Sequence, residues 1–176
     1  MIVDPRNILM FGANAFLLHL FLMVNSALAG WSLYVLLLGP MLVFPALYPR
    51  LPAAMLCLFV TGLWIDATFP SPFGLFAVAM PVGGVFVYHL RIRFRAEHNY
   101  HPVILAHAAN LVFLILLTVS SGKELYAFAG FWKQVVLTSL LSHIMLLVVA
   151  PWFFNLQRLL FEIFRLDLEP DEFPNV

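Results

Sequence analysis

One carboxylate lies well inside an apolar stretch of this sequence. It is Asp66, within the run LFVTGLWIDATFPSPFGLFA at residues 58–77. A charged side chain inside a membrane-type span is by default a functional hypothesis, as a proton relay or an ion ligand. The position of Asp66 near the end of its run favours a structural role instead. In that role the carboxylate accepts N–H groups of the chain reversal or lies at the positive N-terminus of the next helix.

Histidines are the second set of residues with chemical potential. His19, His107 and His143 each lie inside a different apolar run, and together such side chains could ligate haem, copper or zinc. Each stands alone on its run, without the His-x-x-x-His or Glu-x-x-His spacing that would pre-set a site. The sequence therefore predicts no metal and no cofactor, and instead interhelical hydrogen bonds made by these histidines together with Asn14, Asn25 and Asn110.

The composition is that of an integral membrane protein. Hydrophobic residues make up 63% of the chain, charged residues only 10%, and the mean hydropathy is +0.97, whereas an ordinary soluble domain carries about 25% charged residues. The sequence contains no G-x-x-x-x-G-K-[ST], G-x-G-x-x-G, G-x-S-x-G or H-E-x-x-H motif, so no enzyme active site is predicted. A net charge of +0 offers no field for nucleic acid, and the single cysteine, Cys57, cannot form an intrachain disulfide.

Six stretches are long and apolar enough to span a bilayer, which takes about 20 residues. They cover residues 8–29, 31–48, 51–69, 73–90, 102–120 and 132–154. The sequence thus predicts an all-α, six-transmembrane-helix bundle forming a single membrane domain. Pro40 and Pro45 interrupt the second run, and Pro81 the fourth. Ordinary kinks are the favoured interpretation, and broken helices that line a cavity or a partner groove are the alternative.

The first run ends in Ala27-Leu28-Ala29, which resembles a signal-peptidase site. Asp4 beside Arg6 and the long apolar core argue against cleavage, so a retained span is predicted. At the break between the third and fourth runs, Ser71 followed by Pro72 predicts a helix start, with the hydroxyl as N-cap and proline at the first helical position.

Basic residues set the expected orientation. With a cytoplasmic N-terminus and six spans, both termini are cytoplasmic, Lys123 and Lys133 lie outside, and the other seven of the nine Lys and Arg residues lie inside, as the positive-inside rule requires. The Asp66 reversal then faces outward. Arg91, Arg93 and Arg95 are interpreted as a signal that fixes topology, with attraction of anionic membrane lipid as the alternative.

After Phe154 the last helix is predicted to continue out of the membrane. Residues 155–166 read as an amphipathic helix at the inner interface. Its apolar face would carry Leu156, Leu159, Leu160, Ile163 and Phe164, and its polar face Gln157, Arg158, Glu162 and Arg165. Residues 167–176 form an acidic tail, interpreted as a solvated terminus, with a docking segment for a cytoplasmic partner as the alternative.

The order Gly62, Asp66, Ser71, Pro72 and Gly74 in GLWIDATFPSPFGLFA resembles the signature of the rod shape-determining protein MreD family. The chain length, the six apolar runs and the arginine-rich stretch after the fourth run agree with it. The resemblance implies a non-catalytic scaffold subunit of the bacterial inner membrane. It would bind MreC and help couple MreB filaments to peptidoglycan synthesis by RodA and its penicillin-binding partner. Gly62 and Asp66 would shape the reversal, and Gly74 would allow close helix approach.

MreD-like chains are also similar to the substrate-binding membrane subunits of energy-coupling-factor vitamin transporters, which are likewise six-span proteins broken by Pro and Gly. This resemblance implies an alternative function, vitamin binding. In that case Asp66 and its reversal, with His19, Asn14 and His107, would line an outward-facing pocket.

Overall fold

The computed structural model describes residues 5–69, 71–90, 101–121, 126 and 129–166. All regular secondary structure in this part of the chain is helical, which confirms the all-α part of the predicted fold class. Its elements are α1 (Pro5–Leu28), the 3-10 helix η1 (Ala29–Trp31), α2 (Gly39–Leu47), α3 (Leu51–Thr68), α4 (Leu75–Leu90), α5 (His101–Ser120) and α7 (Ala129–Ile163). The arginine-rich stretch with Arg91, Arg93 and Arg95, the acidic tail at 167–176, Asp4 and Lys123 lie outside the described residues.

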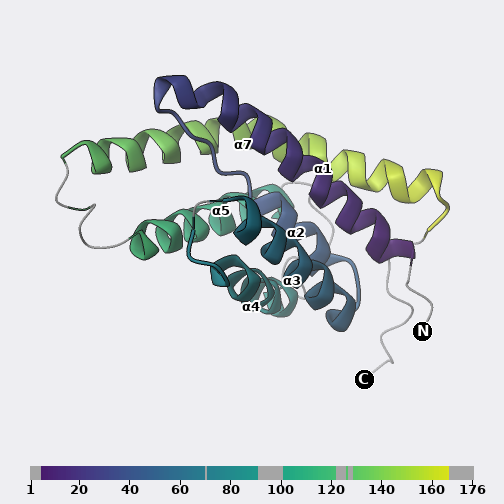
Figure 1. Cartoon of the computed structure of the whole chain (residues 1–176). Coiled ribbons are helices and arrows are strands. Elements are labelled where there is room, and N and C mark those ends of the chain that lie inside the picture. The colour runs from purple at the N-terminus through teal and green to yellow at the C-terminus, as the bar shows by residue number, and fades with distance from the viewer. Residues whose placement is uncertain (1–4, 70, 91–100, 122–125, 127–128, 167–176) are drawn as a thin grey trace.

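The helices form two groups. Figure 1 shows α1 and α7 running side by side across the molecule, with α2, α3, α4 and α5 packed together beneath them. The most extensive helix pair is α3 with α4. The short α2 contacts each of α1, α3, α4, α5 and α7, and it packs most against α5 and α4. The short α2 is therefore the central element of the core.

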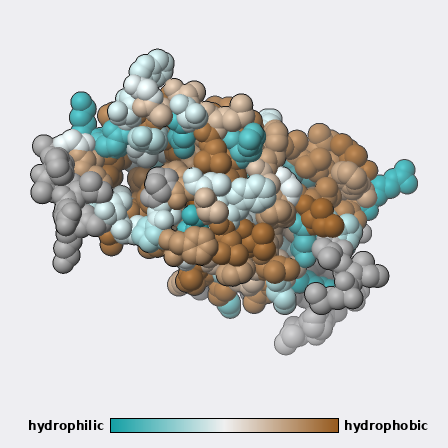
Figure 2. Space-filling model, in the orientation of Figure 1, coloured by the Kyte–Doolittle hydropathy of each residue, from teal (hydrophilic) through white to brown (hydrophobic). Residues whose placement is uncertain are grey.

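Four helical stretches are long and apolar enough to cross a membrane: Pro5–Trp31, Leu51–Thr68, His101–Ser120 and Gly130–Ile163. The apolar α4 is shorter, at 16 residues. Figure 2 shows hydrophobic residues spread over much of the visible surface, and large apolar side chains on α1, α4, α5 and α7 are exposed. These features are compatible with a membrane protein.

The second apolar run is not the kinked helix that we predicted. Only Gly39–Leu47, nine residues, is α-helical, and residues 33–38 have no regular secondary structure although Val35–Leu38 are buried. Pro40 stands at the start of α2, because it has no N–H to continue a helix from upstream. Pro45 and Pro81, by contrast, lie inside continuous helices. The favoured interpretation is therefore wrong for the first part of the second run, whereas α4 runs through Pro81 without a break.

The helix after the 71–72 break also begins later than predicted. It starts at Leu75 rather than at Ser71–Pro72, and Gly74 directly before it has φ +95°. A left-handed residue cannot be part of an α-helix, so the helix can start only after Gly74. Ser71 is not the N-cap, and its hydroxyl points instead to Asp66.

The last helix runs unbroken from Ala129 to Ile163, so residues 155–163 continue the helix of the sixth run, as predicted. Leu159, Ile163 and Phe164 are exposed, as expected of the predicted apolar face. Gln157, which we assigned to the polar face, is 1% exposed. The reason is packing: Gln157 lies one turn from the buried Phe161 on the side that contacts the other helices.

Candidate functional site

Asp66 is bound to the start of α4. Its Oδ2 atom accepts the N–H groups of Gly74 at 3.1 Å and Ala77 at 2.9 Å, and its Oδ1 atom accepts the N–H of Phe76 at 3.0 Å. The Ser71 hydroxyl donates to Oδ1 at 3.4 Å. A carboxylate at a helix N-terminus satisfies N–H groups that have no partner within the helix and is stabilised by the helix dipole. Asp66 of α3 therefore acts as the cap of α4.

Two glycines make this arrangement possible. A Cβ on Gly62 would lie 2.3 Å from the carbonyl oxygen of Phe76, so only glycine lets α3 and α4 approach so closely one turn before the carboxylate. Gly74 has open space around its Cα, but its φ of +95° suits glycine. The roles implied by the family resemblance are thus exchanged: Gly62 provides the close approach, and Gly74 provides the turn.

The irregular segment, residues 33–38 of the second run, takes its hydrogen bonds from side chains of other helices. Asn25 of α1 pairs with Val35 in both directions, accepting its N–H at 2.7 Å and donating to its carbonyl oxygen at 2.9 Å. The hydroxyl of Ser142 on α7 accepts the N–H of Leu36 at 2.8 Å. Irregular backbone inside an apolar bundle is tolerated only where such partners exist. These side chains hold the irregular segment in place.

The N-terminus of α2, like that of α4, is capped by a side chain of a neighbouring helix. The Oδ1 atom of Asn110 on α5 accepts the N–H groups of Leu38 at 3.0 Å and Gly39 at 3.3 Å. One turn before Asn110, the carbonyl oxygen of Ala106 lies 2.0 Å from the place where a Cβ on Gly39 would be. In both cases a glycine lies against the backbone of a neighbouring helix. Four residues after this contact on one of the two helices, a polar side chain caps the N-terminus of the other.

Asn14 links α1 to α2 and α3 by hydrogen bonds. Its amide nitrogen donates to the carbonyl oxygen of Met41 at 3.1 Å and to the Thr61 hydroxyl at 3.2 Å. Asn14 and Asn25 are separated by 11 residues, or close to three helical turns, so both side chains point from one face of α1 to the second run. Both are buried.

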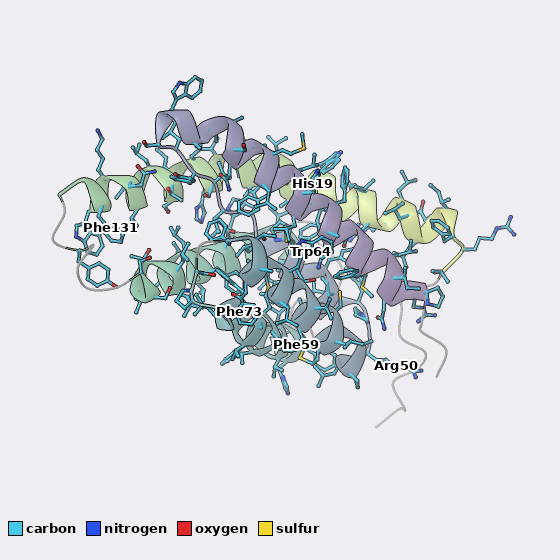
Figure 3. All side chains as sticks on the ribbon, in the orientation of Figure 1. His19, Arg50, Phe59, Trp64, Phe73 and Phe131 are labelled. Atoms are coloured by element: carbon cyan, nitrogen blue, oxygen red, sulfur yellow. The ribbon has the colours of Figure 1, made fainter. Side chains whose placement is uncertain are left out.

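The three histidines do not form one cluster. The rings of His107 on α5 and His143 on α7 stack with centroids 5.4 Å apart, and Nδ1 of His143 lies 2.8 Å from the carbonyl oxygen of Ser139. His19 is exposed on α1, where Figure 3 labels it. Over the described residues, no group of three or more His, Cys, Asp or Glu side chains is placed to hold a metal ion.

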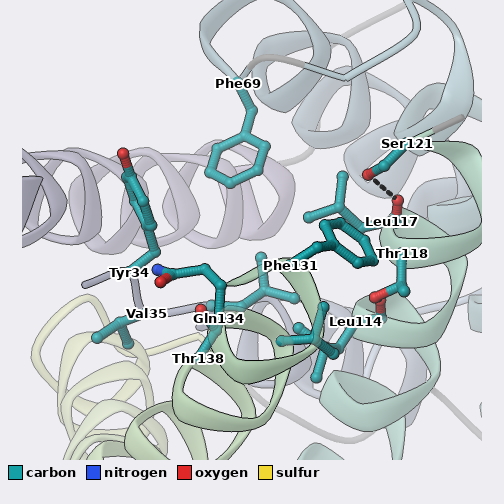
Figure 4. Close-up of a pocket in the computed structure, with 12 residues that line it drawn as sticks. Tyr34, Val35, Phe69, Leu114, Leu117, Thr118, Ser121, Phe131, Gln134 and Thr138 are labelled. Carbon is teal, nitrogen blue, oxygen red and sulfur yellow. Dashed lines mark hydrogen bonds between the residues drawn. The ribbon is translucent and has the colours of Figure 1, made fainter. Parts of the chain in front are cut away.

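A cavity of about 220 Å³ opens at one end of the bundle. It lies between the last two turns of α5, the first turns of α7, the irregular segment and Phe69 of α3 (Figure 4). Its walls are mostly apolar, with polar groups on Thr118, Ser121, Gln134 and Thr138. The Ser121 and Thr118 hydroxyls donate to carbonyl oxygens one turn back on α5. The cavity therefore presents few free polar groups to a ligand.

The predicted site residues divide between three places. Asn14 and Asn110 both form hydrogen bonds with the backbone at α2, and the motif residues lie at the α3–α4 turn. The ring of His107 stacks on that of His143, whereas His19 lies at none of these places. None of Asp66, His19, Asn14 and His107 lines the cavity, so the pocket implied by the vitamin-transporter resemblance is not built from those residues. The interhelical hydrogen bonds of Ser142 and Thr61 could not be predicted from the sequence, because a single hydroxyl in an apolar helix is common and carries no distinguishing pattern.

Comparison of the chain with protein-family models, with curated proteins and with solved structures finds no match. The structure itself defines the class: an all-helical protein with several apolar helices of membrane-spanning length. Its core is organised around a broken second run and two helix starts that are capped by neighbouring helices.

The Asn110 cap should contribute strongly to stability. Asn110→Leu leaves the Leu38 and Gly39 N–H groups buried without an acceptor, so we expect a loss of about 2–4 kcal/mol in the free energy of unfolding. Gln157→Leu is the matched control, because Gln157 is equally buried but neither of its amide atoms has a hydrogen-bond partner among the described residues. It should be neutral or stabilising. Thermal unfolding of both variants in detergent measures the difference, and equal melting temperatures would contradict the assignment.

Proposed function

We propose that this protein is a non-catalytic scaffold subunit of the MreD type in the bacterial cell-elongation complex. It crosses the inner membrane six times, with both termini in the cytoplasm. The irregular segment and α2 together make the second crossing. It binds MreC within the membrane and helps couple MreB filaments to peptidoglycan synthesis by RodA and its penicillin-binding partner.

One observation supports this proposal above the others. The motif residues Gly62, Asp66 and Gly74 all serve the geometry of one hairpin, through a close helix contact, a cap and a left-handed turn. Asp66 has four hydrogen bonds that hold the start of α4, and it does not line the cavity. A carboxylate with these hydrogen bonds fixes the position of α3 relative to α4, as expected of a scaffold subunit.

The cavity favours a second candidate function, the substrate-binding subunit of an energy-coupling-factor-type vitamin transporter. It opens at the end of the bundle that carries the Asp66 reversal, which is the outward end in the proposed topology. Its volume of about 220 Å³ is below the 300–1,000 Å³ usual for pockets that bury drug-sized ligands. A vitamin would need a wider and more polar pocket, and we therefore place this function second.

The proposal predicts which proteins accompany the chain. Purified in mild detergent from bacterial membranes, the full chain should bring down a single-span MreC-type protein, and depletion of the chain should make rod-shaped cells round. Recovery of an ATPase module instead, with loss of vitamin uptake on depletion, would contradict the scaffold and select the second candidate. A chain with Gly130→Ala serves as control, because Gly130 has open space around it and the variant should fold unchanged.

A further inference from the structure

The outward position of His19 is unusual for its surroundings. It lies near the middle of α1, a 24-residue apolar helix of membrane-spanning length, and it is exposed. No hydrogen bond joins its imidazole to any described residue. Histidines within membrane spans almost always face a bundle interior or a water-filled cavity, and pair there. Lipid chains offer no hydrogen-bond partner, so this side chain lacks one as long as the protein stands alone.

Other exposed residues continue this face of α1 with a regular spacing. Gly12, His19 and Ser26 follow each other at intervals of seven, and Phe16 and Met23 stand four residues after the first two. All five are exposed. Alternating intervals of four and three place these side chains in one stripe along a helix, which is the pattern of a seam between two packed helices. We call these five residues the α1 stripe.

Gly12 shows that the stripe has room for a close neighbour. A Cβ at Gly12 would meet no atom within 4 Å, so glycine is not required there by any contact inside the protein. Gly39 and Gly62, in contrast, are each pressed against the backbone of another helix. Small residues and hydrogen-bonding side chains are what drive helices together in a membrane, where burial of apolar surface contributes little. The α1 stripe offers both kinds of residue. Phe16 borders on Trp152 of α7, with ring centroids 6.4 Å apart, but all five side chains of the stripe remain exposed.

We infer that the α1 stripe is the docking surface for a single transmembrane helix of another protein, which carries a hydrogen-bonding side chain at mid-membrane opposite His19. Gly12 admits the backbone of that helix, Phe16 and Met23 pack against its side chains, and His19 and Ser26 form hydrogen bonds with it. The inference rests on the proposed function, in which a single-span partner is bound within the membrane, and it assigns the surface that binds that partner.

Site-specific photo-cross-linking in membranes tests this assignment. The full chain, carrying benzoylphenylalanine in place of Phe16, is co-expressed with the single-span partner and irradiated. We expect an adduct of the two proteins from position 16 and none from the same substitution at Val148, which is 73% exposed on α7. Gly12→Leu should lower the adduct yield about tenfold by blocking close approach, and His19→Leu about threefold by removing the hydrogen bond.

Matched controls separate the surface from general effects. Gly130→Leu changes another helical glycine with open space around it, and His89→Leu changes another exposed histidine. Both should leave the adduct unchanged. An adduct with a second copy of the chain would overturn the inference, as would a partner that still co-purifies in full with Gly12→Leu and gives no adduct at position 16. If the unaltered chain co-purifies with no single-span protein, that result contradicts the proposed function, and with it the inference that rests on that function.

Discussion

Gly62→Ala is expected to unfold or severely destabilise this protein. The added methyl group would lie 2.3 Å from the Phe76 carbonyl oxygen, 2.6 Å from its carbon and 2.8 Å from the Cα atom of Ala77. All three are backbone atoms of α4, so no side chain can rotate away and the whole helix has to move. Movement of α4 would also pull its first N–H groups away from Asp66.

The expected loss combines these two effects. Overpacking of a tight contact costs about 1–3 kcal/mol, and weakening of a helix cap adds about 1 kcal/mol. For a chain of this size such a loss corresponds to a fall in Tm of roughly 5–15 °C. Thermal unfolding in detergent, followed by size-exclusion chromatography, measures it. Gly12→Ala is the control, since its methyl group meets nothing within 4 Å and alanine favours the helix. Equal Tm values for the two variants would show that α3 and α4 are not in the contact described above.

Asp66→Asn is expected to have the second largest effect. Both carboxylate oxygens of Asp66 accept hydrogen bonds, Oδ1 from Phe76 and Oδ2 from Gly74 and Ala77. An asparagine can present only one oxygen to these donors, so its NH₂ group must face at least one N–H that has lost its acceptor. The negative charge that complements the positive end of α4 is lost as well.

We expect Asp66→Asn to lower the free energy of unfolding by about 2–4 kcal/mol, since hydrogen bonds to charged groups contribute about 1.5–3 kcal/mol. Partner assembly should decline in parallel with the folded fraction. Glu162→Gln, which neutralises an exposed carboxylate on α7, should change neither stability nor assembly. If Asp66→Asn left stability and assembly intact but abolished uptake of a small molecule, the scaffold function would be contradicted and the transporter subunit favoured.

Some of this architecture was predictable from the sequence. The long apolar runs define α1, α3, α5 and α7 nearly to their ends, because a span of about 20 apolar residues has few alternatives to a helix. A carboxylate at the end of such a run, followed by a Pro- and Gly-containing break, predicts that Asp66 accepts N–H groups near the next helix start, and its hydrogen bonds are of this kind. These features are local, so the order of residues is enough to state them.

The path of the second run was decided only by the tertiary structure. Its residues are as apolar as those of a membrane-spanning helix. Residues 33–38 can stay outside a helix only because Asn25, Ser142 and Asn110 of three other helices form hydrogen bonds with their backbone. The same holds for the exchanged roles of Gly62 and Gly74, and for the outward position of His19. Hydropathy and spacing describe one helix at a time, whereas the satisfaction of a backbone hydrogen bond and the exposure of a face depend on which helices pack around it.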